Sequence, residues 1–272
     1  MEPVEEAIKQ QLIASPVICL DETGMRIKGE REWCHVVSTE NLTYYAPNSH
    51  RGSEANEDMG ILPAYNGTSM HDGWSSYFKF KCKHALCNVH HLRDLIFIHE
   101  EEKRKWAKDV IDLMITIKAT VDRRKPIHFK LDIPEIKNFE DEYDLLIEKA
   151  KIEDPPPIAC NTQGLIKKRG KMKKTKSQNL LERLQKYRKE ALAFMYDFSV
   201  PFDNNLAERD LRMMKVQQKI SGNFRSWDGA KIFCCIRGYI STVKKNSISV
   251  IDAIQGAFEG HPFIPARTLI AV

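Results

Sequence analysis

Short apolar runs separated by polar turns characterise the first third of the chain. Val17 to Leu20 is a continuous apolar run, which is typical of a central strand buried on both faces. Two runs rich in β-branched and aromatic residues, Glu32 to Ser38 and Leu42 to Ala46, flank the polar turn Thr39 to Asn41 and predict a hairpin. Beyond the hairpin, the pattern predicts a helix and two further strands at Ser53 to Leu62, Thr68 to His71 and Ala85 to Val89.

Helical spacing dominates from His90 onward. Apolar residues recur at helical intervals through Glu100 to Asp122 and predict a long amphipathic helix. A second helix is expected around Phe139 to Ala150, before the prolines at 155 to 157, and a third over Ser177 to Tyr196. The remaining predicted helices are a short lead-in at residues 1 to 15 and two closing helices at Ala230 to Lys244 and Val250 to Phe258. Together these elements predict an α/β fold with an early antiparallel meander.

The length and composition restrict the class of protein. At 272 residues, the chain can bury a full core as one large α/β domain or as one domain with an insertion. It contains neither a run of about eighteen apolar residues nor the basic and apolar regions of a signal peptide, so we expect a cytoplasmic protein without a membrane span. The seven cysteines are scattered and lie mostly in apolar runs, which favours reduced thiols over a disulfide framework.

The net charge of +5 is unevenly distributed. Seven of the ten residues from Lys167 to Lys176 are Lys or Arg, whereas Asp132 to Asp154 contains nine Asp and Glu. The basic block, which includes Lys167, Lys168 and Arg169, can be a solvated connection, or it can hold DNA phosphates through counterion release without reading the base sequence. The charge pattern leaves both interpretations open.

Three acidic residues, far apart in the sequence, stand in positions suited to one composite metal site. Asp21 follows the first apolar run, Asp72 follows Thr68 to His71, and Glu208 lies one turn into a helix opened by Pro201 to Asn205. Hard cations such as Mg²⁺ prefer a few carboxylate oxygens and keep positions open for water and phosphate. Each acid also has an ordinary explanation, because strand-end Asp residues usually accept turn hydrogen bonds and acids are common near helix starts.

The helix that carries Glu208 adds a further indication. Asn204 or Asn205 can cap its start, and the helix dipole favours a carboxylate in the first turn. Arg212 and Lys215 follow Glu208 at i+4 and i+7, so one polar stripe presents a candidate metal ligand beside two phosphate-binding cations. The alternative is an exposed Glu–Arg pair that contributes roughly 0.3 kcal/mol.

A cluster of cysteines and histidines raises the question of a zinc site. Its members are Cys82, His84, Cys87, His90 and His91. Their spacing does not form the two ligand pairs of a zinc finger, and Cys87 with Val89 fits the packing of the fifth strand. We therefore reject zinc binding at this cluster.

Basic and aromatic residues alternate around Gly222. Lys219 and Arg225 can grip a DNA backbone, and neighbouring aromatic rings can stack on exposed bases. Phe224 and Trp227 fit a packed core under a loop better than a base-stacking surface, so we predict that both are core residues.

Six short motifs follow one another along the chain. They are Asp21-Glu22-Thr23-Gly24; Tyr45-Ala46-Pro47 with Arg51-Gly52-Ser53-Glu54-Ala55; His71-Asp72-Gly73-Trp74-Ser75-Ser76-Tyr77; Ala85-Leu86-Cys87-Asn88-Val89-His90-His91-Leu92-Arg93-Asp94-Leu95; Asn204-Asn205-Leu206-Ala207-Glu208-Arg209; and Lys219-Ile220-Ser221-Gly222-Asn223-Phe224-Arg225-Ser226 with Gly229-Ala230. In this order they resemble the catalytic domain of the IS66 family of bacterial insertion-sequence transposases.

The resemblance implies a ribonuclease-H-like fold: a mixed five-stranded sheet with flanking helices and a helical insertion before the last catalytic residue. It implies that Asp21, Asp72 and Glu208 are the catalytic and metal-binding DDE residues, with Mg²⁺ as cofactor and Mn²⁺ as an alternative. The reaction would be cleavage of transposon ends followed by transfer of their 3′-hydroxyl groups into target DNA. Residues expected to contact DNA are His90, His91, Arg93, Lys167, Lys168, Arg169, Arg212, Lys215, Lys219 and Arg225.

The resemblance also predicts the partners and the organisation of the chain. Transposon ends and target DNA are the expected partners, together with a second copy in a synaptic complex and other element-encoded proteins, at the nucleoid in the bacterial cytoplasm. The predicted segments are a lead-in at 1–15, the sheet-bearing core at 16–99, a helical insertion at 100–200, the closing core helices at 201–260 and a tail at 261–272. Family members carry further N-terminal sequence, so we expect a fragment, a truncated copy or a chain that works with a separate recognition subunit.

Two other functions stay open at this point. One is a truncated, non-catalytic DNA-binding or regulatory remnant of a transposase, which the intact acids argue against. The other is a related nuclease such as a ribonuclease H or a junction resolvase. The long helical insertion and the Asn204 to Arg209 motif argue against that nuclease.

Overall fold

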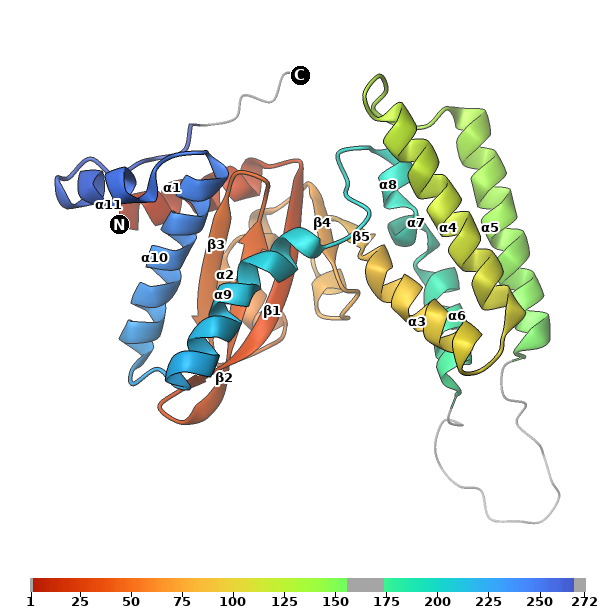
Figure 1. Cartoon of the computed structure of the whole chain (residues 1–272), viewed down its shortest axis with the longest axis horizontal. Helices are drawn as coiled ribbons and strands as arrows, with labels where there is room; N and C mark the ends of the chain where they lie inside the picture. Colours follow the sequence, from red (N-terminus) through yellow and green to blue (C-terminus); the bar gives the residue numbers. More distant parts are fainter. Residues whose placement is uncertain (1, 156–173, 267–272) are drawn as a thin grey trace, which may run out of the picture. The chain divides into compact units, whose positions relative to one another are not determined.

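The computed structural model describes residues 2–155 and 174–266, and the basic residues Lys167, Lys168 and Arg169 lie outside this part of the chain. The chain forms two compact units (Figure 1). Unit 1 comprises Met1–Leu86 and Asp203–Val272, and unit 2 comprises Cys87–Phe202. Unit 2 is therefore an insertion in the sequence of unit 1.

Unit 1 is built on a mixed five-stranded sheet in the order β3-β2-β1-β4-β5. The strands are β1 (Val17–Ile27), β2 (Glu30–Ser38), β3 (Thr43–Asn48), β4 (Thr68–His71) and β5 (Lys83–Leu86). β1 pairs antiparallel with β2 and parallel with β4, while β3 extends the antiparallel side and β5 the parallel side. The α/β class, the hairpin and the mixed five-stranded sheet are confirmed.

The first strand is much longer than the apolar run that predicted it. β1 continues to Ile27 because its second half pairs with β2 after β4 has ended. Asp21 is paired in register with Val36 and therefore lies within a strand. The alternative that Asp21 belongs to a turn is wrong.

The fifth strand ends earlier than predicted, at Leu86. Cys87 is already the residue before helix α3 (Asn88–Glu100), and Val89 lies in the first turn of that helix. The main-chain N–H of Asn88 donates to the Phe202 carbonyl across 3.1 Å, and its side-chain amide donates to the Ala191 carbonyl across 2.9 Å. These distant partners favour the helical start, so the prediction of strand packing at Cys87 and Val89 is wrong.

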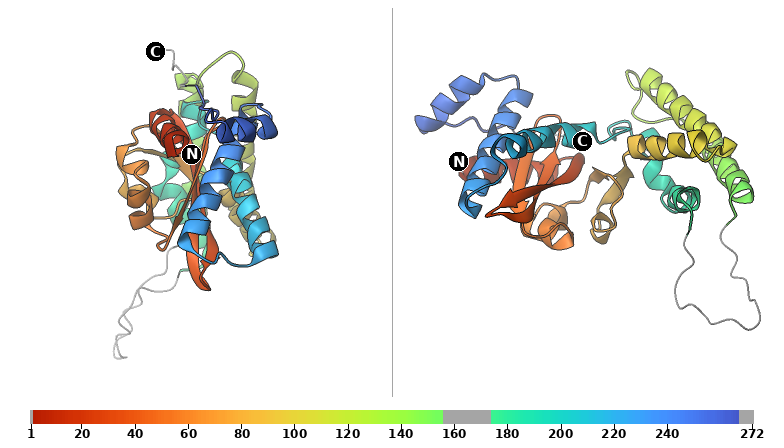
Figure 2. Two further views of the ribbon diagram at one scale, coloured as in Figure 1. Left: turned by 90° about the vertical axis from the view of Figure 1, so that its left-hand side faces the viewer. Right: turned by 60° about the horizontal axis from the view of Figure 1, so that its bottom comes forward.

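Helices cover both faces of the sheet, as the edge-on view shows (Figure 2). α9 (Asn205–Ser221) and α10 (Trp227–Lys245) lie on one face, and α1 (Glu2–Ala14) and α2 (Ser53–Met59) lie on the other. Two single-turn 3₁₀ segments, η1 (Leu62–Ala64) and η2 (Tyr77–Lys79), and α11 (Val250–Phe258) complete the unit. The predicted lead-in helix is α1, and it buries Val4, Ile8 and Leu12 in the same cluster as Ile18 and Leu20 of β1.

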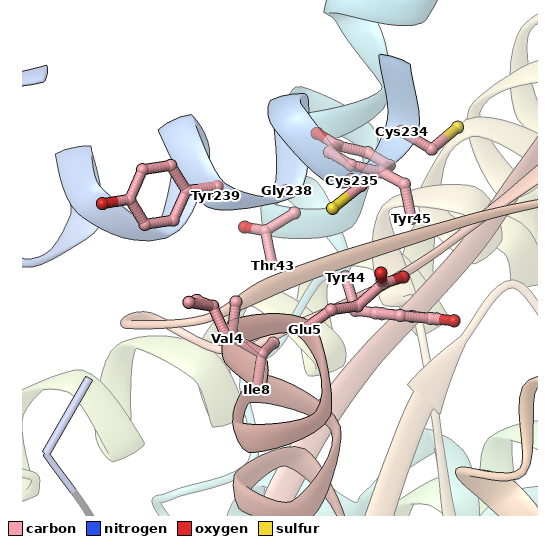
Figure 3. A pocket seen from close by; sticks show the side chains of 10 residues that line it. All are labelled: Val4, Glu5, Ile8, Thr43, Tyr44, Tyr45, Cys234, Cys235, Gly238 and Tyr239. Atoms are coloured by element: carbon pink, nitrogen blue, oxygen red, sulfur yellow. The ribbon is translucent and has the colours of Figure 1, made fainter. Parts of the chain in front are cut away.

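Close packing holds α10 against the edge strand β3. At Gly238 an added Cβ would lie 3.1 Å from the main-chain oxygen of Thr43, a tighter contact than Cβ atoms usually make. A small pocket lies beside this contact, between Val4 and Ile8 of α1, β3 and the Gly238–Tyr239 turn of α10 (Figure 3). The glycine therefore allows the helix and the edge strand to pack closely at this point.

Unit 2 is a helical assembly with its own apolar core. Besides α3 it contains α4 (Lys105–Arg124), α5 (Ile133–Glu153), α6 (Lys176–Lys186), α7 (Arg188–Ala191) and α8 (Ala193–Tyr196). The third predicted helix is thus broken into three. Near the breaks, side chains from other helices donate hydrogen bonds to main-chain carbonyls. The Tyr143 hydroxyl donates to the Leu184 carbonyl, and the Asn88 amide donates to the Ala191 carbonyl.

Within residues 2–155 and 174–266, no helix combines the length and apolar character that a membrane span requires. In the same part of the chain, six cysteines are present and none of them is in a disulfide. Of the two adjacent cysteines of α10, Cys234 is buried and Cys235 is partly buried.

Candidate active site

Asp21 and Asp72 occupy the same level of two neighbouring parallel strands. The parallel register pairs Val17 with Thr68 and Cys19 with Met70. Continuing it by two residues brings Asp21 opposite Asp72, which directly follows β4. Because side chains alternate along a strand and match across a register, both carboxylates belong to the face of the sheet shared with Cys19 and Met70.

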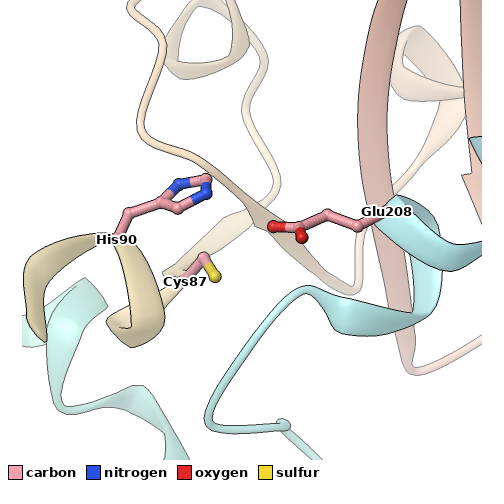
Figure 4. A group of neighbouring side chains, drawn as sticks. All are labelled: Cys87, His90 and Glu208. Atoms are coloured by element: carbon pink, nitrogen blue, oxygen red, sulfur yellow. The ribbon is translucent and has the colours of Figure 1, made fainter. Parts of the chain in front are cut away.

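α9 covers that face and carries the third acid. Ser38 is paired in register with Cys19, and its hydroxyl donates to Asp210 of α9 across 2.6 Å. The same helix buries Ala207, Leu211 and Met214. Glu208 lies in the first turn of α9, as predicted, and is partly buried (Figure 4).

The electrostatics of Asp21 show that other acids are near it. Burial raises the pKa of Asp21 to about 7, and the negative charges of Glu22, Asp72 and Glu208 add to this rise. The main-chain N–H of Glu22 donates to Asp21 Oδ1 across 2.8 Å and opposes the rise. Burial is the largest cause of the raised pKa. The protein groups around Asp21 therefore do not fully offset the cost of burying its negative charge.

A tight turn orients Asp72. The main-chain N–H of Trp74 donates to Asp72 Oδ1 across 2.9 Å, which is the side-chain turn bond expected for a strand-end Asp. Gly73 adopts a φ of 90°, in the region that favours glycine, and its N–H donates to His71 Nδ1 across 3.0 Å. The turn and a metal-binding role are compatible, because the turn uses only one carboxylate oxygen.

A pair of histidines, the buried His71 and the partly buried His84, supports this turn. Since His71 Nδ1 accepts from Gly73, the proton of neutral His71 is on Nε2, which lies 3.1 Å from His84 Nδ1. His84 Nε2 then donates to the Phe80 carbonyl across 3.1 Å. Burial lowers the pKa of His71 to about 3, in agreement with a neutral ring.

Asp210 is a mostly buried acid whose burial could not be inferred from the sequence. It pairs with Lys245 of α10 across 2.7 Å, with only 9% of the Asp210 side chain exposed. It also accepts from Ser38 and Thr43, and its main-chain oxygen accepts from Tyr45. These contacts seat α9 on the sheet and so help to place Glu208, two residues earlier.

The predicted DNA-contacting residues of unit 1 are at the surface. Arg212, Lys215 and Lys219 are exposed along α9, and Arg225 is exposed in the loop that follows. Phe224 in that loop bridges the end of β1, with its N–H donating to Arg26 and its carbonyl accepting from Lys28, both at 2.8 Å.

Phe224 and Trp227 are only partly buried. The prediction that both are core residues is wrong. Phe224 is held at the end of the β1–β2 hairpin by its backbone, which leaves part of its ring at the surface.

The predicted contacts in unit 2 differ among themselves. His90 lies in the first turn of α3, just after Cys87, and is partly buried (Figure 4). Arg93 is exposed. His91 is buried, its Nδ1 lies 3.2 Å from Asn88 Oδ1, and burial lowers its pKa to about 3. A neutral, enclosed ring is unsuited to a phosphate, so His91 is left out of the DNA surface proposed below.

The sheet order, the helices on both faces and the acids on β1, after β4 and on α9 define a ribonuclease-H-like α/β protein. The family model described as Transposase IS66 family matches residues 1–232, and the chain belongs to this family. Membership makes DNA a partner and gives nuclease and transferase chemistry as the general activity. No curated protein matches the chain.

Proposed function

We propose that this chain is the catalytic domain of a DNA transposase that cleaves transposon ends and joins their 3′-hydroxyl groups to target DNA by a two-metal DDE mechanism. The observation that carries the proposal is electrostatic. Asp72 and Glu208, both distant from Asp21 in the sequence, lie near enough to raise its pKa. This proximity supports the proposal that the three carboxylates act together as one composite metal site.

The donor set suits Mg²⁺. Two Asp and one Glu supply hard carboxylate oxygens, which Mg²⁺ prefers while it retains water and phosphate ligands. The raised pKa of Asp21 marks a place where negative charge is incompletely compensated, and a divalent cation would compensate it. Mn²⁺ prefers the same ligands and would substitute.

Each acid has a distinct role in this proposal. Asp21 would be a ligand common to both cations, Asp72 would help to hold one of them and Glu208 the other. When bound, Mg²⁺ lowers the pKa of the attacking water or 3′-hydroxyl and stabilises the leaving oxygen. The protein orients its ligands beforehand, through the Glu22 N–H on Asp21 and the Trp74 N–H on Asp72.

DNA would approach along the exposed side of α9. Arg212 and Lys215 follow Glu208 on this helix and offer cations to phosphates near the acids. Lys219 and Arg225 extend the row toward the next loop. Because two transposon ends must be cut and joined together, we expect two copies of the protein to act in one complex.

Family membership favours the transposase over a ribonuclease H or a junction resolvase. A non-catalytic remnant differs from the transposase in a measurable way, because it would bind DNA without cleaving it. Cleavage of oligonucleotides that contain transposon ends, with and without Mg²⁺, separates these two functions.

The direct test uses Asp21→Asn and Glu208→Gln, which remove a charge with little change of shape. Both should abolish Mg²⁺-dependent cleavage and strand transfer while DNA binding is retained. Glu40→Gln, at an exposed acid in the β2–β3 turn, serves as the control and should cleave normally. Full activity in either site variant would refute the assignment.

A further inference from the structure

Glu22 follows Asp21 but serves a different purpose. Successive strand residues point to opposite faces, so Glu22 lies on the face away from α9. Its side chain is 2% exposed. Arg51 Nε donates to Glu22 Oε1 across 2.9 Å, Arg51 Nη2 lies 2.8 Å from the same oxygen, and the Tyr77 hydroxyl donates to Oε2. Both oxygens of Glu22 are thus engaged by the protein.

Arg51 in turn is held between two indole rings. Its guanidinium carbon lies 4.8 Å from the ring centre of Trp33 and 4.2 Å from that of Trp74. A planar guanidinium can stack on aromatic faces and donate in its own plane at once, which the ammonium of lysine cannot do. Arg51 therefore connects Glu22 on β1 to Trp74 in the turn after β4.

Trp74 carries the connection to the second acid. Its main-chain N–H is the group that donates to Asp72 Oδ1. Fixing the Trp74 ring against Arg51 restrains the turn, and with it the orientation of the Asp72 carboxylate. A continuous series of contacts therefore runs from Asp21 through Glu22, Arg51 and Trp74 to Asp72. It links β1 to the turn after β4 beyond the last paired residues of these two strands, Cys19 and Met70.

We propose that Glu22, Arg51 and Trp74 form a positioning bridge that sets the Asp72 carboxylate relative to Asp21. These are positioning residues, since they act through Asp21 and Asp72 and not on the substrate. The inference rests on the proposed function, because it assigns the two aspartates to one metal site. Residues that orient metal ligands typically change metal affinity or activity by roughly 10–100-fold when altered.

The test compares Arg51→Lys with a matched control, Arg31→Lys. Arg31 also stacks on Trp33, at 5.0 Å, but is not part of the bridge. Mn²⁺ binding to the full chain without DNA is measured from the electron paramagnetic resonance of free Mn²⁺, and Mg²⁺ dependence is measured in a cleavage assay. Arg51→Lys should weaken Mn²⁺ binding and raise the Mg²⁺ requirement by roughly 10–100-fold, whereas Arg31→Lys should change neither.

Thermal unfolding separates positioning from a merely structural role. If Arg51→Lys lowers the melting temperature but keeps the wild-type Mn²⁺ affinity and Mg²⁺ dependence, the bridge is structural only and the proposal is overturned. If Arg51→Lys loses its cooperative transition, Glu22→Gln, which keeps an acceptor for Tyr77, is measured in its place and must show the same weakening. A wild-type chain that neither binds Mn²⁺ nor cleaves DNA would instead overturn the proposed function itself.

Discussion

The side-chain amide of Asn204 donates a hydrogen bond to the main-chain carbonyl of Leu20 across 2.7 Å. Leu20 precedes Asp21, and Asn204 precedes the helix that carries Glu208. This bond therefore ties the start of α9 to the strand position of the first acid. Asn204 stands at the N-cap position but makes no side-chain capping bond, so the cross-link replaces the predicted cap.

Asn204→Ala should destabilise the protein by about 1–3 kcal/mol, because it leaves a carbonyl without its donor at a buried position. Its cleavage rate should fall further than stability alone explains, since the start of α9 is no longer fixed beside Asp21. Urea unfolding and single-turnover cleavage measure the two effects. Asn205→Ala, at the exposed neighbouring residue, should change stability by less than about 0.5 kcal/mol.

The Asp210–Lys245 ion pair should be important because it is mostly buried, with 9% of the Asp210 side chain and 13% of the Lys245 side chain exposed. Lys245→Met leaves the Asp210 carboxylate without its cation, and we expect a loss of about 3–5 kcal/mol in the free energy of unfolding. Replacing both residues, as Asp210→Leu with Lys245→Met, should recover part of this loss. The exposed pair Lys108–Asp112 on α4 provides a contrast.

Lys108→Met should cost no more than about 1 kcal/mol, because exposed pairs contribute little. A double-mutant cycle on each pair, followed by chemical denaturation, measures the coupling. Equal coupling energies in the two pairs would contradict a buried, position-setting role for Asp210.

Stability should fall in acid partly because of His91, which adds to the effect of buried His71. Burial and the nearby Arg183 lower the pKa of His91 from the ordinary 6.5 to about 3, although Asp94 opposes the shift. Between these values the unfolded chain binds a proton that the folded chain does not, so the free energy of unfolding decreases as the pH falls through this window. The contribution is about 1 kcal/mol per pH unit.

Unfolding measured at several pH values tests this prediction. His91→Gln should reduce the slope of the free energy of unfolding against pH between pH 6.5 and pH 3. His128→Gln, at an exposed histidine in the same unit, should leave this slope unchanged. An unaltered slope in His91→Gln would show that another group is responsible.

Asp21→Asn should make the metal-free protein more stable at pH 8. The folded pKa of Asp21 is raised from 3.8 to about 7, so the folded chain keeps a proton that the unfolded chain has already released. Stability therefore falls as the pH rises through this window, and the amide removes that loss, which amounts to roughly 3–4 kcal/mol. Added Mg²⁺ should stabilise the wild type more than the variant, which differential scanning calorimetry with and without chelator can measure.

Local patterns were sufficient for several elements. β4 has the predicted bounds, Thr68 to His71, and α11 has the predicted bounds, Val250 to Phe258. In both segments the apolar pattern and the residues that break it at each end indicate the same bounds, so the local sequence was enough to predict them. The second half of β1 is different, because Asp21-Glu22-Thr23-Gly24 has the composition of a turn and becomes a strand only by pairing with β2.

The candidate site was partly predictable for the same reason. Asp21, Asp72 and Glu208 could be chosen from their local settings, and their assignment as ligands stays a prediction. Asp210 could not be chosen, because in sequence it is one more acid on a polar helix. Its burial depends on Lys245 and Ser38, which lie on other elements. The partners of Glu22 were hidden in the same way.

The hydrogen bond between the Asn88 N–H and the Phe202 carbonyl closes the inserted helices into a loop that starts and finishes at one point. A segment whose two ends lie close together can be lengthened, shortened or exchanged without changing the strand arrangement of the sheet to which it is attached. The helical unit is therefore a suitable place for grafting another binding module, while β1, which carries Asp21, and β4, which Asp72 follows, stay unchanged.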